Sequence, residues 1–113
     1  MAERVVLFCG ATLVLPDRVE SGATLVVQGG RIVDLVHGPR AVGDGDIRLD
    51  LQDHVIVPGF VDVHVHGSYG VDVLDGAGSV ARVAAALPRS GVTAFCPTTV
   101  ACDPVSLDAV LTA

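Results

Sequence analysis

The sequence predicts an α/β protein built from a small antiparallel β part and two strand–helix units that follow it. Short β-branched runs separated by turn residues fill the first half of the chain. After Pro58-Gly59, two apolar strand patterns alternate with two helical patterns, which is typical of parallel βα units. The 113 residues are 50% hydrophobic and 18% charged, which excludes intrinsic disorder. We expect two parts, at residues 1–57 and 58–113.

The first part is expected to consist of β-strands joined by short turns. The expected strands are residues 5–9, 12–15, 23–28, 31–36 and 47–51. Gly29-Gly30 fits a tight hairpin turn, because glycine reaches positive φ without steric cost. These strands predict a small antiparallel sheet or half of a β-sandwich.

The second part is expected to alternate strands and helices. The expected order is a strand at residues 61–65, a helix at 80–87, a strand at 92–96 and a helix from Val105 onward. The spacing in the first helix places four apolar residues on one face, Val80, Val83, Ala84 and Leu87. Gly91 suits the left-handed position past a helix end, and Asp103-Pro104 fits an N-cap followed by proline. Two such units cannot close a barrel, so we expect the N-terminal portion of a larger protein.

Charge and cysteine content exclude several classes of function. Thirteen acidic residues against seven basic ones give a net charge of −6, and the basic residues are scattered arginines. A nucleic-acid binder or a basic membrane-surface helix is therefore not expected. The three cysteines, Cys9, Cys96 and Cys102, form no CxxC pair, which favours a reducing compartment. No apolar run approaches the roughly 18 residues that cross a bilayer, so a cytoplasmic protein is predicted.

The strand at residues 61–65 leads into the most informative pattern of the chain. Side chains alternate along a strand, so Asp62, His64 and His66 should share one face and three valines the other. Two imidazoles at adjacent positions of one face can reach a single metal ion. We therefore predict that His64 and His66 are metal ligands. The alternative is a pair of merely polar residues on a surface strand.

For some of the other polar and small residues the sequence allows two roles, and for the rest it indicates a simple structural role. Asp62 either orients a metal ligand or is a structural charge in the interior. Gly67 and Gly70 either let the loop approach a substrate or form a tight turn. We expect His37, in a polar loop, and His54, at a turn, to be solvated. We expect Cys96 to be a small buried hydrophobic residue. Asp72 is expected to cap or solvate its turn. Thr98 and Thr99 either line a pocket or cap the backbone.

Three segments resemble a known enzyme family. Residues 57–67, VPGFVDVHVHG, are similar to the opening signature of the amidohydrolase superfamily. Residues 64–72, HVHGSYGVD, and 90–99, SGVTAFCPTT, resemble the glycine-rich loop and second-strand segment of the N-acetylglucosamine-6-phosphate deacetylase family. The resemblance implies that residues 1–57 are part of a small β-sandwich. It also implies that residues 58–113 are the first two βα units of an incomplete (β/α)8 TIM-like barrel.

The same resemblance implies an activity and a cofactor. The family hydrolyses the acetamide of N-acetylglucosamine 6-phosphate, giving glucosamine 6-phosphate and acetate. His64 and His66 would hold a divalent metal ion, zinc first and iron or another divalent metal as alternatives. The remaining ligands and the catalytic Asp would lie beyond Ala113, so this chain alone is expected to be inactive, and the full-length form to be a homo-oligomer.

Two alternatives to this function remain open. One keeps the superfamily and changes the substrate to a cyclic amide or another N-acyl compound. The other is a non-catalytic fragment whose strands serve only as an interaction surface.

Overall fold

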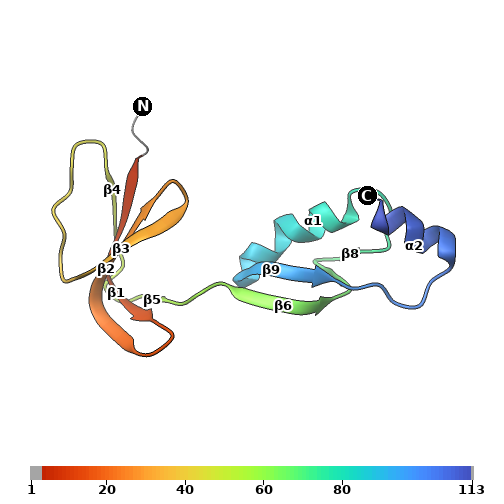
Figure 1. The fold of residues 1–113 in the computed structure, drawn as a ribbon, viewed down its shortest axis with the longest axis horizontal. Coiled ribbons are helices and arrows are strands. Elements are labelled where there is room, and N and C mark those ends of the chain that lie inside the picture. Colours follow the sequence, from red (N-terminus) through yellow and green to blue (C-terminus); the bar gives the residue numbers. More distant parts are fainter. Residues whose placement is uncertain (1–3, 113) are drawn as a thin grey trace. The chain divides into compact units, whose positions relative to one another are not determined.

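The computed structural model describes residues 4–112, which form a mixed α/β structure of β-strands and short helices. The chain divides into two compact units, Met1–Pro58 and Gly59–Ala113. The first unit contains only strands, whereas the second contains parallel strands together with helices (Figure 1). The predicted α/β class is therefore confirmed. Within the described residues, no helix is long and apolar enough to cross a membrane.

The first unit is one five-stranded sheet. Its strands are β1 (Val5–Val14), β2 (Val19–Gln28), β3 (Arg31–His37), β4 (Ile47–Asp50) and β5 (Val55–Ile56). The order is β3-β2-β1-β4, and β5 also pairs with β1. Strands β1, β2 and β3 are antiparallel, and the predicted turn at Gly29-Gly30 joins the last two, with φ of 57° and 71°.

The prediction of an antiparallel sheet is wrong for β4, and β5 was not among the predicted strands. Both β4 and β5 run parallel to β1. Because β2 already occupies one edge of β1, the chain must cross from β3 to the far edge, and the segment between His37 and Ile47 makes that crossing. Parallel strands of one sheet need a crossover connection of this kind, whereas a short hairpin turn joins antiparallel strands.

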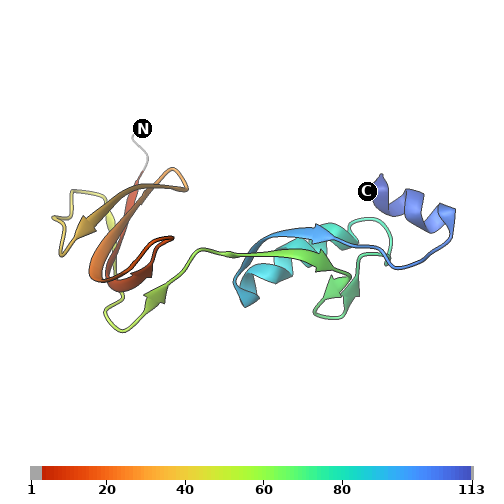
Figure 2. The same ribbon diagram turned by 60° about the horizontal axis from the view of Figure 1, so that its bottom comes forward.

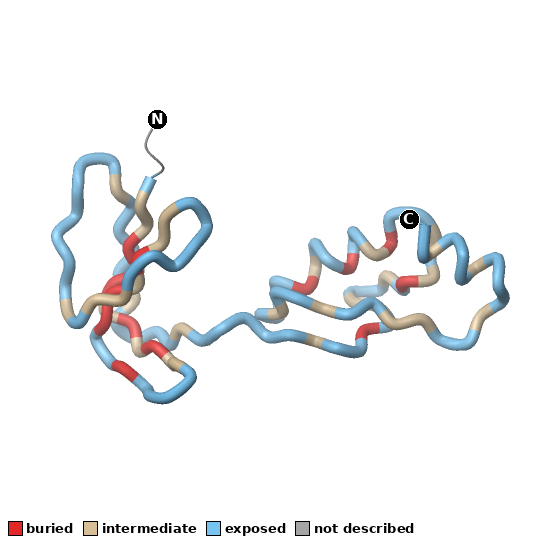
Figure 3. The backbone as a smooth tube through the Cα atoms, viewed as in Figure 1, coloured by how far each residue is buried: buried red, intermediate tan, exposed pale blue. Residues whose placement is uncertain are grey.

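Strand β1 carries the core of the first unit. Alternate residues of β1 are buried, namely Leu7, Cys9, Ala11 and Leu13. Buried segments of the first unit are drawn in red in Figure 3. This period of two is what a strand with one covered face requires. The sequence predicted two strands here, but the structure has one, with an irregularity in register at Gly10. Gly10 has a φ of 81°, which lets the strand bend without ending.

The second unit follows the predicted order of strand, helix, strand and helix. Its elements are β6 (Phe60–Val65), β7 (Gly67–Ser68), β8 (Val71–Asp72), α1 (Ser79–Ala86), a 3₁₀ turn (Leu87–Ser90), β9 (Val92–Pro97) and α2 (Pro104–Leu111). Strands β6 and β9 pair in parallel, and α1 runs alongside them in both views (Figures 1 and 2). The short strands β7 and β8 form a hairpin directly after β6.

The helix ends match their sequence signals. Gly91 closes the 3₁₀ turn in the left-handed conformation, with a φ of 77°. At the start of α2, the Asp103 Oδ1 accepts hydrogen bonds from the backbone N–H groups of Val105 at 3.0 Å and Ser106 at 3.1 Å. Hydrogen bonds from Ser106, its hydroxyl foremost, lower the pKa of the Asp103 carboxyl. The predicted N-cap is therefore confirmed.

The apolar contacts of the second unit differ in part from the prediction. The core cluster contains Val65, Val73, Val83 and Leu87, and Val80 packs against it. Ala84, expected on the buried helix face, is exposed.

The predicted valine face of β6 holds only at its end. Val65 is 5% exposed, but Val61 and Val63 are 67% and 71% exposed. Strand β6 pairs with β9 through a register shift between Asp62 and Val65, and the exposure of Val61 and Val63 shows that no described residue covers that part of the strand.

Candidate metal centre

His64 and His66 lie together at the end of β6. Their Nε2 atoms are 3.0 Å apart, and their rings meet edge to face at 89°, with centroids 4.7 Å apart. Both side chains are exposed. The structure therefore brings the same nitrogen, Nε2, of the two predicted ligands together.

The distance between the two nitrogens fits a shared metal ion. Zinc–imidazole bonds of about 2.0–2.1 Å at angles between 90° and tetrahedral place two ligand nitrogens about 2.9–3.4 Å apart. The observed 3.0 Å lies in this range. With no ion between them, the same distance suits a hydrogen bond in which one imidazole donates to the other.

A backbone carbonyl fixes the orientation of the second imidazole. The Nδ1 of His66 lies 2.8 Å from the carbonyl oxygen of Thr98. A carbonyl only accepts, so Nδ1 carries the hydrogen and, in the neutral ring, Nε2 keeps its lone pair. The Thr98 N–H in turn donates to the Val65 carbonyl at 2.8 Å. Thr98 thus links the loop after β9 to the backbone and to the ring at the end of β6.

Two residues left open by the sequence make backbone contacts. The Oδ1 of Asp62 accepts a hydrogen bond from the backbone N–H of His64 at 3.1 Å. This contact braces the strand beside the first imidazole. The Thr98 hydroxyl donates to the Cys96 carbonyl at 3.1 Å, which is the backbone-capping role.

The glycines after His66 form a tight hairpin. A Cβ on Gly67 would lie 2.2 Å from the Val71 carbonyl oxygen, so only glycine fits there. Gly70 has a φ of 78° and Tyr69 a φ of 51°, the combination that a two-residue turn of this hand requires. Gly70 thus lies in the tight turn itself, whereas Gly67 lies in the strand that leads into it. The left-handed conformation costs a residue such as tyrosine roughly 1–2 kcal/mol.

Tyr69 makes two contacts that sequence reasoning missed. Its hydroxyl shares a hydrogen bond with the Ser90 Oγ at 2.9 Å. The Arg89 guanidinium carbon lies 5.9 Å from the centroid of the tyrosine ring, within reach of a cation–π interaction. These partners are about twenty residues away in sequence, and no local pattern connects them. The sequence offers one signal for this residue: Tyr69 stands directly before a glycine in a two-residue turn, a place where a positive φ is needed.

An open hollow of about 470 Å³ adjoins the second imidazole. It is lined by His66, by the hairpin residues 67–72 and by Asp75. The Asp72 Oδ1 accepts a hydrogen bond from the Leu74 N–H at 2.8 Å, which confirms its predicted capping role. The hollow gives solvent-sized molecules access to the side of His66.

The other two histidines lie in the first unit. His37 ends β3, and its Nδ1 lies 2.9 Å from the Oε1 of Glu20, a buried carboxylate that also accepts from the Arg18 Nε at 3.1 Å. The prediction of a loop histidine was therefore wrong for His37, although its side chain is 82% exposed. His54 is exposed, as predicted.

The cysteine predictions hold in part. Cys96 is exposed, so its predicted burial was wrong, and Cys9 is the buried thiol. The apolar sequence around Cys96 was misleading because the face of β9 that carries it is uncovered.

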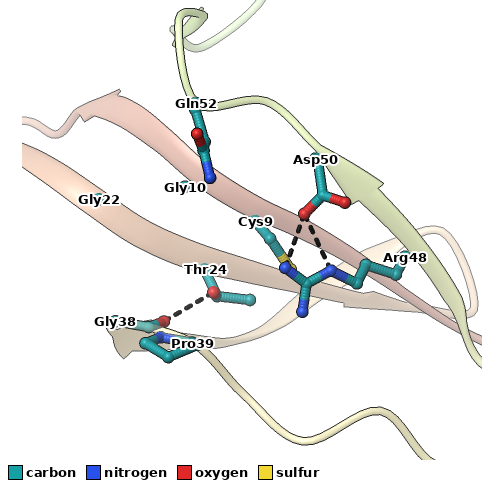
Figure 4. Close-up of a pocket in the computed structure, with 9 residues that line it drawn as sticks. All are labelled: Cys9, Gly10, Gly22, Thr24, Gly38, Pro39, Arg48, Asp50 and Gln52. Atoms are coloured by element: carbon teal, nitrogen blue, oxygen red, sulfur yellow. Dashed lines mark hydrogen bonds and ion pairs between the residues drawn. The ribbon is translucent and has the colours of Figure 1, made fainter.

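A pocket of about 370 Å³ lies in the first unit (Figure 4). Its lining is Cys9, Gly10, Gly22, Thr24, Gly38, Pro39, Arg48, Asp50 and Gln52. The Arg48 guanidinium donates to the Asp50 Oδ1 at 2.7 and 2.9 Å, and this contact raises the pKa of Arg48. Because the one cation of the lining is neutralised by its neighbour, the pocket offers no free charge to a ligand.

Two imidazoles are the metal-binding donors that the described part of the chain assembles. Among residues 4–112, no group of three or more His, Cys, Asp or Glu side chains is placed to hold one ion. A zinc site in a protein has three or four protein ligands. Among the described residues, the pair therefore has no third side chain that would complete such a site.

The chain is similar to known proteins over most of its length, although no family model matches it. It is 39% identical over 99 residues to N-acetylglucosamine-6-phosphate deacetylase from Rattus norvegicus, covering 77% of this chain and 24% of that protein. It is 41% identical over 87 residues to the Homo sapiens enzyme of the same name, covering 71% of this chain and 21% of that protein. The resemblance to N-acetylglucosamine-6-phosphate deacetylases is confirmed. The chain spans less than a quarter of the length of these relatives.

A solved structure agrees in fold. The crystal structure of N-acetylglucosamine-6-phosphate deacetylase from Pasteurella multocida matches with a TM-score of 0.84 and 22% identity. The match covers 96% of this chain and 29% of that chain. The chain thus shares the fold of one region of that deacetylase.

Proposed function

We propose that the protein containing this chain is a metal-dependent hydrolase of N-acetylglucosamine 6-phosphate. The reaction would release acetate and leave glucosamine 6-phosphate. The observation that carries the proposal is the 3.0 Å separation of the His64 and His66 Nε2 atoms, within a segment that resembles the deacetylases. Two imidazoles whose Nε2 atoms lie this close suit an enzyme that hydrolyses an unreactive amide with a metal ion.

His64 and His66 would hold a divalent metal ion through Nε2. Zinc fits imidazole nitrogen well, and iron or another divalent metal is the alternative. When bound, such an ion supplies Lewis acidity and a water nucleophile that ionises near neutral pH. Thr98 holds the His66 ring in the tautomer that presents Nε2, and Asp62 braces the backbone of His64.

We place this pair at the rim of a (β/α)8 barrel of which residues 58–113 are the first two βα units. Residues 1–57 would be part of a β-sandwich that precedes it. Catalytic residues gather at the C-terminal ends of the strands in such barrels, and His66 directly follows β6. The exposure of Val61 and Val63 supports further elements that cover β6, because apolar strands of parallel sheets are normally buried on both faces.

The remaining ligands and the proton donor would come from outside these residues. Two imidazoles leave at least one further protein ligand of a catalytic zinc shell to be supplied. A carboxylate that carries a proton to the leaving amine is also needed, because a free amide anion is too poor a leaving group. Free cysteines at Cys9, Cys96 and Cys102 suit a cytoplasmic enzyme, and we expect the intact protein to be a homo-oligomer.

The proposal is tested by acetate release from the intact gene product. The protein is stripped of metal with a chelator, reloaded with zinc, and given N-acetylglucosamine 6-phosphate. We expect turnover only in the reloaded protein, and its loss in His64→Ala and His66→Ala. His54→Ala, which removes an exposed histidine that is not part of the pair, is the matched control and should retain full activity.

Other outcomes would contradict the proposal. Turnover of a cyclic amide or of a different N-acyl compound, without action on the sugar phosphate, would show that the protein has another amidohydrolase activity. Absence of any metal-dependent hydrolysis in a folded, metal-loaded protein would support the non-catalytic alternative.

A further inference from the structure

The hairpin after His66 contains an unusual residue. Among the described residues, Tyr69 is the one non-glycine residue with a positive φ, at 51°. We propose that Tyr69 is a positioning residue for His66, and that it acts by tying the hairpin β7–β8 to the turn before β9. The proposal rests on the proposed role of His66 as a metal ligand.

The hairpin holds the backbone of His66 on its carboxyl side. Gly67 follows His66 directly and pairs with Asp72 across the hairpin. The N–H of Val73, just beyond the hairpin, donates to the His66 carbonyl at 2.8 Å. Any movement of the hairpin therefore moves the backbone from which the His66 ring projects.

Tyr69 anchors the tip of that hairpin. Asparagine or glycine adopts the left-handed turn position more easily than tyrosine does, so the turn itself gives no reason for this side chain. The side chain instead reaches the Ser90 hydroxyl at 2.9 Å and lies under the Arg89 guanidinium at 5.9 Å. Local strain that is held by specific contacts is typical of functional positions.

Two sets of contacts hold His66, and both involve residues next to strand β9. Ser90 stands two residues before β9, and Thr98 follows the end of β9. The His66 ring is held through the Thr98 carbonyl, and its backbone is held through the hairpin, Tyr69 and Ser90. The ring and the backbone of His66 are therefore both held by residues next to β9. This keeps the His66 Nε2 in place relative to His64.

The test measures zinc affinity and hairpin opening in the intact gene product. Affinity is measured by competition with a chromophoric chelator, and opening by amide hydrogen exchange at Val73. We compare wild type with Tyr69→Phe, Ser90→Ala, the double variant and Tyr69→Asn. We expect Tyr69→Phe and Ser90→Ala each to weaken zinc binding about two- to tenfold, the range that one hydrogen bond spans. The double variant should add little to either.

Tyr69→Asn separates positioning from stability. Asparagine relieves the backbone strain, so the variant should keep or raise the melting temperature. The variant lacks the contacts of the Tyr69 side chain with Ser90 and Arg89, so it should bind zinc more weakly than wild type. A purely structural role for Tyr69 predicts instead that zinc affinity follows stability.

The remaining outcomes are also decisive. Wild-type affinity in Tyr69→Phe and Tyr69→Asn, or faster exchange at Val73 without a loss of affinity, would overturn the role of Tyr69. His66→Ala is included so that failure of the proposed function is recognised separately. If His66→Ala binds zinc as wild type does, His66 is not a ligand and both proposals are wrong.

Discussion

The Nδ1 of His66 donates to the Thr98 carbonyl at 2.8 Å, while the Thr98 N–H donates to the carbonyl of the residue before His66. One residue thus fixes both the ring and the strand end that carries it. Metal-binding histidines in proteins characteristically donate their second N–H to a carbonyl or carboxylate in this way. In the neutral ring this arrangement leaves the lone pair on Nε2, the nitrogen that we propose binds the metal ion.

The tautomer of His66 is therefore predictable. In the metal-free protein at a pH where the ring is neutral, nitrogen-15 NMR should show the hydrogen on Nδ1 and none on Nε2. The hydrogen bond to the Thr98 carbonyl is the physical reason, since a carbonyl cannot donate. A ring protonated on Nε2 alone would show that the carbonyl does not direct it. His54, whose side chain is exposed, supplies the reference spectrum in the same sample.

Gly67 should tolerate no side chain. In Gly67→Ala the new Cβ would meet the Val71 carbonyl at 2.2 Å, so the hairpin backbone must move. We expect a lower melting temperature and weaker zinc binding, because His66 directly precedes this glycine. Gly70→Ala is the matched control, since its Cβ would enter open space and the cost there is only that of the positive φ, about 1 kcal/mol. Equal effects of the two substitutions on zinc binding would contradict this interpretation.

Val83 should be the more sensitive of two helical valines. Its side chain is fully buried in the cluster with Val65, Val73 and Leu87, whereas Val105 is 79% exposed. Val83→Ala should reduce the free energy of unfolding by about 2 kcal/mol, through lost burial and the cavity left behind. Val105→Ala should change it by no more than about 0.5 kcal/mol. Denaturant unfolding measures both, and a reversed order would show that α1 packs differently.

The cap of α2 should make stability depend on pH. The pKa of Asp103 is lowered in the folded state by its hydrogen bonds with Ser106 and Val105. A lowered folded-state pKa stabilises the fold above the ordinary carboxyl pKa of about 3.9, and this stabilisation is lost as the pH falls through the lowered value. Asp103→Asn keeps a good N-cap but cannot titrate, so it should lose less stability than wild type on acidification below about pH 4. Parallel acid unfolding curves for the two proteins would contradict the prediction.

Local signals in the sequence predicted local structure well. Gly29-Gly30, Gly91 and the Asp103-Pro104 pair each determine a turn or a helix end through their own backbone preferences. The His64 and His66 pair was found in the same way, because alternation along one strand brings them to one face.

Features that depend on distant partners were missed. The parallel pairing of β4 with β1 depends on how the chain crosses the sheet, and the hydrogen bond between Tyr69 and Ser90 joins residues in different elements. Cys96 was predicted to be buried from its apolar neighbours, but burial is decided by what covers a face. Tertiary contacts of this kind leave no pattern in a short stretch of sequence.

The central claim is that His64 and His66 hold one metal ion together. A crystal of the zinc-loaded intact gene product, measured at the zinc absorption edge, tests it directly. We predict an anomalous peak about 2.0–2.1 Å from the Nε2 atoms of both residues, with the His66 Nδ1 still bonded to the Thr98 carbonyl. Zinc bound elsewhere, with the two imidazoles hydrogen-bonded to each other, would contradict the account.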